Sequence, residues 1–169
     1  MSLGENVTGA DNQQERLDNS WIVGFVDGEG CFHVAINKLP KMTLGYQVLP
    51  EFRVVQHVRD IQVLRKIKDT LGVGVVRRNN GDRFELRVRG LEELNRIVKF
   101  FEMYPLMTQK RKSFDLFKEI ILLMNKKKHL SHSGLHKIAK KASQMNRQIK
   151  SSYPESSETI RQNSGRSKI

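Results

Sequence analysis

The sequence predicts an α+β domain in which four antiparallel strands carry helices on one face and leave the other face open. Three observations lead to this prediction. The apolar spacing changes from helical to alternating twice along the chain. Each alternating stretch has the pattern of a hairpin. Lys and Arg exceed Asp and Glu by 12 charges in 169 residues, and an excess of this size indicates a polyanionic partner.

The composition excludes several classes of protein. A single cysteine, Cys31, cannot form an intrachain disulfide. No apolar run reaches the roughly 18 residues of a membrane span, and the first 20 residues are acidic and lack the apolar core of a signal peptide. We therefore expect a protein that is not secreted, has no membrane partner and works where it is made. Gly72 and Gly74 lack the rest of a nucleotide-binding fingerprint, so no small-molecule substrate is expected.

The first half of the chain has the pattern of a helix followed by two strands. The expected elements are a helix from near Leu17 to residues 28–30, a strand at 32–37, a loop at 39–45 and a strand at 46–55. The glycines at the end of the helix suggest a C-terminal cap. Pro50 marks a bulge or an edge position in the returning strand.

The second half repeats this order and then adds helices. The expected elements are a helix at 60–71, strands at 75–79 and 82–89, and helices at 91–101, 110–125 and 135–149. Asp60 can cap its helix, Gly72 ends it, and the turn at 79–82 supplies the positive φ of a tight hairpin. We expect one domain at 13–150, a flexible N-terminus at 1–12 and a tail with a possible short helix at 151–169.

Basic side chains alternate with apolar ones in the predicted strands, so they point away from the core. Residues 31–90 carry a net charge of +7 and residues 109–169 carry +11. The candidate DNA-binding residues are His33, Asn37, Lys38, Lys41, Arg53, Arg77, Arg78, Arg83, Glu85, Arg87, Arg89, Arg147 and Lys150. These faces lack aromatic residues, which disfavours stacking of single-stranded bases. For any one strand, an ordinary solvated face is the alternative.

Gly24 and Gly28 lie four residues apart in the first apolar helix. Each glycine costs roughly 1 kcal/mol relative to alanine in a helix, and close approach of two helices is the usual reason for such a pair. Pairing two copies would bring together the acids at their ends, Asp27 and Glu29, and a divalent cation would relieve their repulsion. Oxygen ligands of this kind suit Mg²⁺. The alternative is a simple helix end with exposed acids.

The segment WIVGFVDGEG at residues 21–30 resembles the motif of LAGLIDADG homing endonucleases. The likeness extends over most of residues 15–162, with further matches at 54–56, 71–77, 104–110 and 156–161. It points to single-motif, intron-encoded members of the chloroplast and rRNA-intron type. The resemblance implies an αββαββα core with a saddle-shaped DNA-binding sheet. It also implies a homodimer whose interface contains Trp21, Gly24, Phe25 and Gly28.

The same resemblance implies an activity and a set of site residues. Expected is site-specific cleavage of both strands of a long pseudo-palindromic DNA across its minor groove, leaving short 3′ overhangs. Mg²⁺ or Mn²⁺ would support cleavage, whereas Ca²⁺ would support DNA binding without cleavage. Glu29, where Asp is more usual, and Gly28 would hold the metal, and Glu29, Gln56 and Lys110 would be catalytic. The strand phase places Gln56 on the core side unless a bulge or the strand end redirects it.

Two other functions remain open on the sequence. One is an RNA maturase that assists group I intron splicing, and the other is a non-catalytic DNA-binding regulator. The expected location is an organelle that encodes and makes the protein, or a prokaryotic cytoplasm. His129, His132 and His136 have a superficial zinc-site spacing, but no nearby carboxylate or cysteine completes it, so solvated or phosphate-facing histidines are expected.

Overall fold

The computed structural model describes residues 16–145. The expected termini at 1–12 and 151–169, and the candidate residues Arg147 and Lys150, lie outside the described residues. The elements are α1 (Asn19–Glu29), β1 (Gly30–Lys38), β2 (Tyr46–His57), η1 (Val58–Asp60), α2 (Ile61–Leu71), β3 (Val75–Asn80), β4 (Arg83–Val88), α3 (Leu91–Met103), α4 (Lys110–Asn125), η2 (Lys128–Leu130) and α5 (His132–Met145). The predicted αββαββα order is confirmed.

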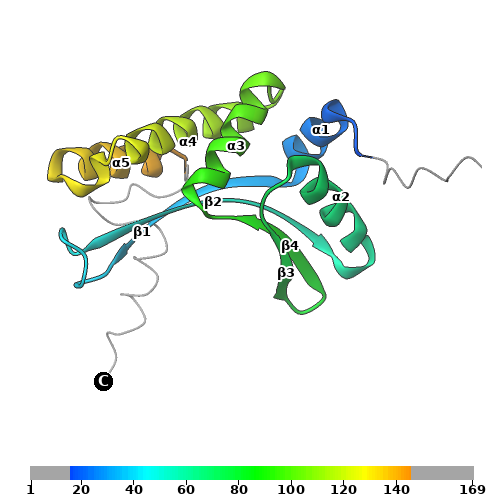
Figure 1. Ribbon diagram of the computed structural model, residues 1–169, viewed down its shortest axis with the longest axis horizontal. Coiled ribbons are helices and arrows are strands. Elements are labelled where there is room, and N and C mark those ends of the chain that lie inside the picture. The colour runs from blue at the N-terminus through cyan, green and yellow to red at the C-terminus, as the bar shows by residue number, and fades with distance from the viewer. Residues whose placement is uncertain (1–15, 146–169) are drawn as a thin grey trace, which may run out of the picture.

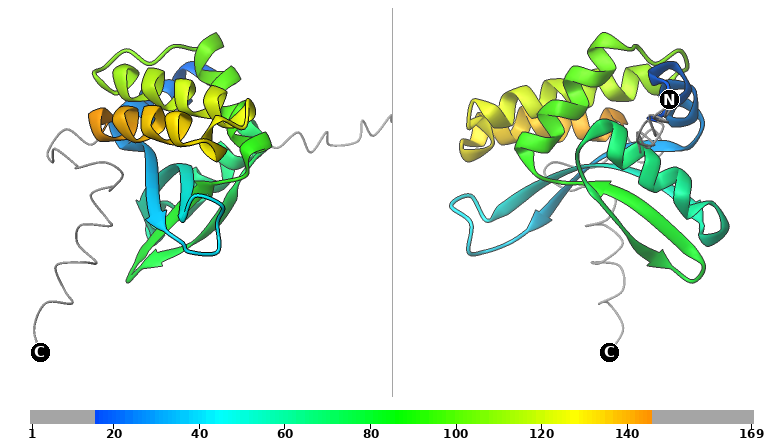
Figure 2. Two further views of the ribbon diagram at one scale, coloured as in Figure 1. Left: turned by 90° about the vertical axis from the view of Figure 1, so that its left-hand side faces the viewer. Right: turned by 45° about the vertical axis from the view of Figure 1, so that its right-hand side comes forward.

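The four strands form one antiparallel sheet in the order β1-β2-β4-β3. The sheet arches beneath the helices, with the two hairpin turns at its opposite ends, and its concave side faces away from the helices (Figures 1 and 2). The predicted α+β class and the free sheet face are therefore confirmed. Within residues 16–145 no helix combines the length and the apolar character that crossing a membrane requires.

A cluster of phenylalanines fixes the helices to the sheet. Phe32 of β1 lies at its centre and contacts Phe52 of β2, Phe101 of α3 and Phe114 and Phe117 of α4, with ring centroids 5.2 to 5.6 Å apart. All five rings are buried. Aromatic pairs at such distances add stabilisation beyond the apolar area that they bury. The cluster thereby sets the position of α4, whose first residue is Lys110.

Different physical effects determine where α1 begins and where it ends. Asp18 starts the helix at Asn19, later than expected, because its carboxylate accepts the N–H groups of Ser20 (2.7 Å) and Trp21 (3.3 Å). The helix ends at Glu29 with Gly30 as its C-cap, as expected, but the cap needs no relief of backbone strain because Gly30 has an ordinary extended φ of −75°. Glycine is needed there for space: a Cβ would lie 2.5 Å from Val26 Cγ1 and 2.9 Å from the Val26 carbonyl oxygen.

Several smaller predictions can be compared with the observed backbone. Gly72 ends α2 with a φ of 67°, and Gly81 supplies the positive φ of the β3–β4 turn at 54°. Asp60 occupies the N-cap position of α2, as expected, but its side chain forms no capping hydrogen bond. Pro50 pairs with Val34 in an unbroken register, beyond the end of β4, so it occupies an edge position and not a bulge.

The close packing at Gly30 predicts that Gly30→Ala destabilises the fold. The added methyl group would press on the backbone of α1, and overpacking of this kind costs about 1–3 kcal/mol. Urea unfolding would measure the loss. Gly90→Ala is the matched control, because its new Cβ would meet only the flexible Glu93 side chain at 3.3 Å. Equal stabilities of the two variants would contradict the prediction.

Candidate active site

The C-terminal end of α1 and the start of α4 meet through a direct hydrogen bond. The Lys110 ammonium donates to the carbonyl oxygen of Val26 at 2.7 Å. Glu29, the last residue of α1, is exposed, and Lys110 lies near enough to it for their charges to interact. The structure thus brings together two of the three predicted catalytic residues, which are far apart in the sequence.

Asp27 holds this junction together. Its carboxylate accepts hydrogen bonds from the Met107 N–H (2.6 Å), the Thr108 N–H (3.3 Å) and the Thr108 hydroxyl (2.8 Å). The Thr108 hydroxyl oxygen in turn accepts the N–H of Lys110 at 3.2 Å. The sequence suggested that Asp27 and Glu29 share a metal site, but Asp27 instead bonds to the loop that presents Lys110.

The ionisation of both groups reflects this arrangement. Burial alone would raise the pKa of Asp27, but hydrogen bonds from Met107 and Thr108 and the charge of Lys110 hold it below its usual range. Burial lowers the pKa of Lys110, although the negative charges of Asp27 and Glu29 act in the opposite direction. At the end of α1 the Lys110 cation therefore lies within range of the charge of the exposed Glu29 carboxylate.

Gln56 lies near this junction but on the helix side of the sheet. The β2–β4 register is continuous through His57 and pairs Gln56 with Phe84, so no bulge redirects the side chain. Val54 is the partner of Gly30, and Gln56 therefore lies beyond the end of β1, where α1 meets the sheet. Its side chain is half-buried there. The catalytic role of Gln56 stays a prediction.

The donors at the end of α1 are oxygens of the type that Mg²⁺ prefers. The Glu29 carboxylate is exposed, and the Gly28 carbonyl belongs to the last helical turn, whose carbonyls lack intrahelical donors. Among residues 16–145 no three His, Cys, Asp or Glu side chains gather into a metal site. Because Asp27 is engaged elsewhere, one chain supplies one free carboxylate at this end.

The outer face of α1 has no partner within the described part of the chain. Ile22, Val23 and Val26 are buried, whereas three of the predicted interface residues, Trp21, Gly24 and Gly28, are exposed on the other side. The fourth, Phe25, is half-buried and packs partly against the core. The rings of Trp21 and Phe25 stack with centroids 4.9 Å apart, and Trp21 is 43% exposed. A Cβ at either glycine would meet nothing within 4 Å, so this face can approach another backbone closely.

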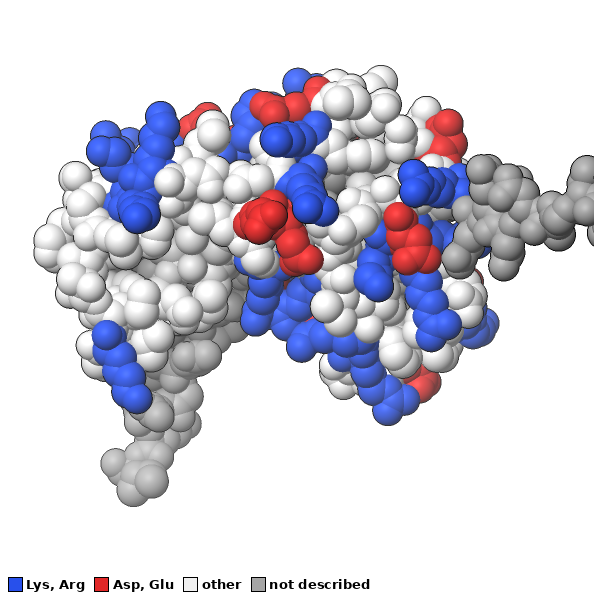
Figure 3. Space-filling model, in the orientation of Figure 1, with Lys and Arg blue, Asp and Glu red and all other residues white. Residues whose placement is uncertain are grey.

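Arginines occupy the outer face of the sheet, and four of them are paired with acidic side chains. Arg53, Arg77, Arg87 and Arg89 all form ion pairs with two buried glutamates, Glu51 and Glu85. Glu85, which the sequence suggested as a DNA contact, is only 2% exposed. The strand pattern could not reveal the role of Glu51, because it depends on the pairing of β2 with β4. In Figure 3 basic side chains gather along the sheet and the β3–β4 hairpin.

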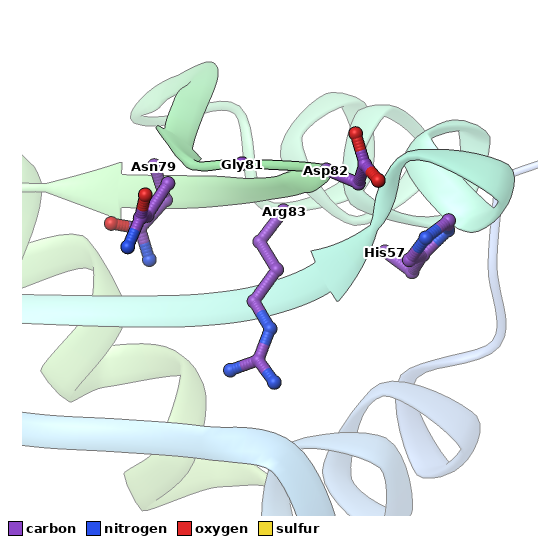
Figure 4. Close-up of a pocket in the computed structure, with 6 residues that line it drawn as sticks. His57, Asn79, Gly81, Asp82 and Arg83 are labelled. Carbon is purple, nitrogen blue, oxygen red and sulfur yellow. The ribbon is translucent and has the colours of Figure 1, made fainter.

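The remaining candidates lie toward the two ends of the sheet. Arg83 lines a polar hollow where β2 ends beside the β3–β4 turn, and its side chain extends to the side opposite to Asp82 (Figure 4). Arg78 pairs with Phe84 in the register and its guanidinium lies 6.0 Å from the ring centroid, which places it on the helix side of the sheet near the β3–β4 turn. Its DNA contact stays a prediction. His33 and Asn37 share the outer face with Arg53, and Lys38 and Lys41 are exposed near the β1–β2 turn.

Comparison with known proteins is consistent with this geometry. The family model described as LAGLIDADG endonuclease matches residues 22–121, more than half of the chain. The chain belongs to the LAGLIDADG endonuclease family. The match includes most of α1 with Glu29, the strand that carries Gln56 and the first turns of α4 with Lys110.

Solved structures and curated relatives agree with the family. The homing endonuclease I-TnaI is 45% identical, with a TM-score of 0.78 over 89% of this chain and 96% of that chain. I-SmaMI, bound to an uncleaved DNA target in the presence of calcium ions, is 31% identical, with a TM-score of 0.79 over 87% of this chain and 49% of that chain. Probable intron-encoded endonuclease 3 of Neurospora crassa is 33% identical over 76% of this chain. The chain spans about a quarter of the first curated relatives.

The bonds of Asp27 predict a pH-dependent contribution to stability. Asp27→Asn should lower the free energy of unfolding at neutral pH by roughly 1.5–3 kcal/mol, the usual worth of hydrogen bonds to a charged group. Because the folded-state pKa is depressed, this contribution is complete above the ordinary value of 3.8 and is lost as the pH falls through the folded-state pKa. Denaturant unfolding between pH 7 and pH 3 would measure it.

Asp115→Asn is the control for this prediction. It removes the same charge from α4, where Asp115 pairs with Arg111 at 3.9 Å and is 47% exposed. An exposed pair of this kind contributes about 0–1 kcal/mol. A loss at Asp27 no larger than the loss at Asp115 would show that Asp27 does not secure the junction.

Proposed function

We propose that this LAGLIDADG endonuclease family member is a homing endonuclease that cleaves both strands of a specific DNA site. The observation that carries the proposal is the position of Lys110, which binds the end of the motif helix and interacts with the charge of Glu29. Lys110 also lies close to Cys31, which pairs with Arg53 and shares the basic face of the sheet with it. DNA lying along that face would present its phosphates to Glu29 and Lys110. The proposed products carry short 3′ overhangs after cleavage across the minor groove.

The chemistry follows from the groups at this junction. Glu29 and the Gly28 carbonyl would hold a divalent cation, Mg²⁺ or Mn²⁺. Such an ion, when bound, stabilises negative charge on phosphate oxygens and activates water. Lys110 is placed to offset the charge that develops on the phosphate, a role that its partial burial strengthens. Gln56 would orient the attacking water from the strand end.

We propose that the active form is a homodimer joined through Trp21, Gly24, Phe25 and Gly28. One chain provides one motif helix, one free carboxylate and one outer sheet face. I-TnaI matches this chain over nearly its full length, whereas the I-SmaMI chain is about twice as long. Two copies of this chain would therefore supply what one longer chain holds. A twofold dimer reads a pseudo-palindromic target.

The proposed partner is double-stranded DNA, contacted by His33, Asn37, Arg53, Arg77, Arg83, Arg87 and Arg89 of the outer face, with Lys38 and Lys41 at its end. I-SmaMI has been seen on its DNA target with calcium ions, which supports the expectation that Ca²⁺ permits binding without cleavage. Relatives whose names place them in introns support synthesis in an organelle or a prokaryotic cytoplasm.

The proposed role of Glu29 is tested by Glu29→Gln. Removal of the carboxylate should abolish cleavage of the target in Mg²⁺, while DNA affinity in Ca²⁺ stays within about tenfold, since the arginine face is unchanged. Plasmid nicking and gel-shift titrations would measure the two effects. Glu92→Gln, on the exposed surface of α3, should cleave normally. Cleavage by Glu29→Gln would refute the assignment, and a wild-type protein that binds without nicking would be a DNA-binding regulator.

The proposed dimer is tested by Gly24→Ala. In a monomer this change should stabilise α1 by about 1 kcal/mol, because alanine favours helix and the new Cβ meets nothing. In a dimer with closely packed α1 helices, the methyl groups would hold the backbones apart and weaken association at least tenfold. Sedimentation equilibrium would measure the association. Unchanged association together with a more stable protein would exclude Gly24 from the interface.

A further inference from the structure

Glu51 is a buried acid at the middle of a surface that should bind a polyanion. It belongs to β2, and its side chain is 7% exposed. Arg87 donates to Glu51 Oε2 through Nε (2.9 Å) and through a terminal nitrogen (2.7 Å), and Arg89 donates to the same oxygen through Nε (2.9 Å). The other oxygen lies 3.6 Å from Arg53. One carboxylate therefore contacts three arginines, one from β2, one from β4 and one that directly follows β4.

The network continues to the edge strand through Glu85. Arg77 of β3 binds Glu85 Oε1 through two nitrogens, each at 2.8 Å, and Arg87 approaches the same oxygen at 3.8 Å. Arg87 thus lies between the two glutamates and is only 16% exposed. Arg77 and Arg89, at the two ends of the network, are 50% and 51% exposed. Buried ions link outer guanidinium groups that can still reach a ligand.

An acid at this place has two physical effects on DNA binding. It cancels one positive charge on the face, which reduces the sequence-independent attraction to phosphates. It also fixes the directions of the guanidinium groups, and direction matters for contacts to base edges because a bidentate pair needs a defined geometry. A neutral residue at position 51 would leave the arginines more charged as a group and less ordered.

We propose that Glu51 is a specificity-determining positioning residue of this endonuclease. It aligns Arg89 toward a base edge through Arg89 Nε, holds Arg87 as the link to Glu85, and suppresses binding to unrelated duplex. Glu51 itself touches no DNA in this arrangement. The inference rests on the proposed DNA-cleaving function, and it assigns the discrimination between target and random sequence partly to an ion pair made before DNA arrives.

The test compares binding to two duplexes in Ca²⁺: the site selected by the wild-type protein from a randomised library, and an unrelated sequence of equal length. Glu51→Gln keeps the shape of the side chain and removes its charge. It should bind the unrelated duplex about 3- to 10-fold more tightly, and the ratio of target to unrelated affinity should fall at least tenfold. The salt dependence on the unrelated duplex should steepen by about one phosphate contact.

Glu92→Gln is the matched control, because it changes the net charge by the same amount at a side chain that is 91% exposed on α3. Its affinity ratio should stay within twofold of wild type. Equal ratios for Glu51→Gln and wild type would overturn the proposal. If the ratio of Glu92→Gln falls as far as that of Glu51→Gln, net charge alone explains the effect, and the proposal is likewise overturned.

Arg89→Lys keeps the test decisive if Glu51→Gln does not fold. Lysine keeps the charge but lacks the guanidinium that Glu51 aligns. In this variant the ratio of target to unrelated affinity should fall at least tenfold, while affinity for the unrelated duplex stays within twofold of wild type. An unchanged ratio of target to unrelated affinity would overturn the proposal. A wild-type protein that selects no duplex from the library would instead refute the proposed function, and the role of Glu51 with it.

Discussion

The contact between the end of α1 and the start of α4 is the constraint on which the site depends. Asp27 binds the loop before α4, and Lys110 binds the backbone of α1 at Val26. In both cases the donors lie on the α4 side and the acceptors on α1, but one side chain reaches out from α1 and the other from α4. The two elements are therefore tied at two separate points. The phenylalanine cluster holds α4 on the sheet. One short stretch of helix therefore connects the exposed apolar face, the acid and the lysine.

Side-chain contacts between neighbouring strands likewise order the basic surface of the sheet. A sheet covered with unpaired arginines would hold any polyanion and would suffer from its own repulsion. Here two glutamates lie between four arginines, so the surface keeps a modest positive charge and an ordered arrangement. Burying carboxylates is costly unless they are fully paired, and each of these contacts at least two guanidinium groups. The order of this surface is thus part of the folded structure itself.

The sequence predicted the fold closely because its signals are local. Alternation, the turn at Gly81 and the stop at Gly72 each act within a few residues. The sequence also predicted Glu29 and Lys110 as a pair, through a resemblance to a family and not through spacing.

Long-range bonds are what the sequence could not show. The partners of Asp27 lie some 80 residues away, and Glu51 meets Arg87 only through the register between β2 and β4. The need for Gly30 likewise comes from a close contact with Val26, which no propensity expresses.

The exposed glycine face of α1 has a consequence for how much protein is active. If two chains must meet through this face, the active species at low abundance grows with the square of the chain concentration, so that doubling the protein raises it about fourfold. At very low concentration the chains would remain monomeric and would not cleave DNA. Association through this single helix would then tie the cutting of DNA to the level of expression.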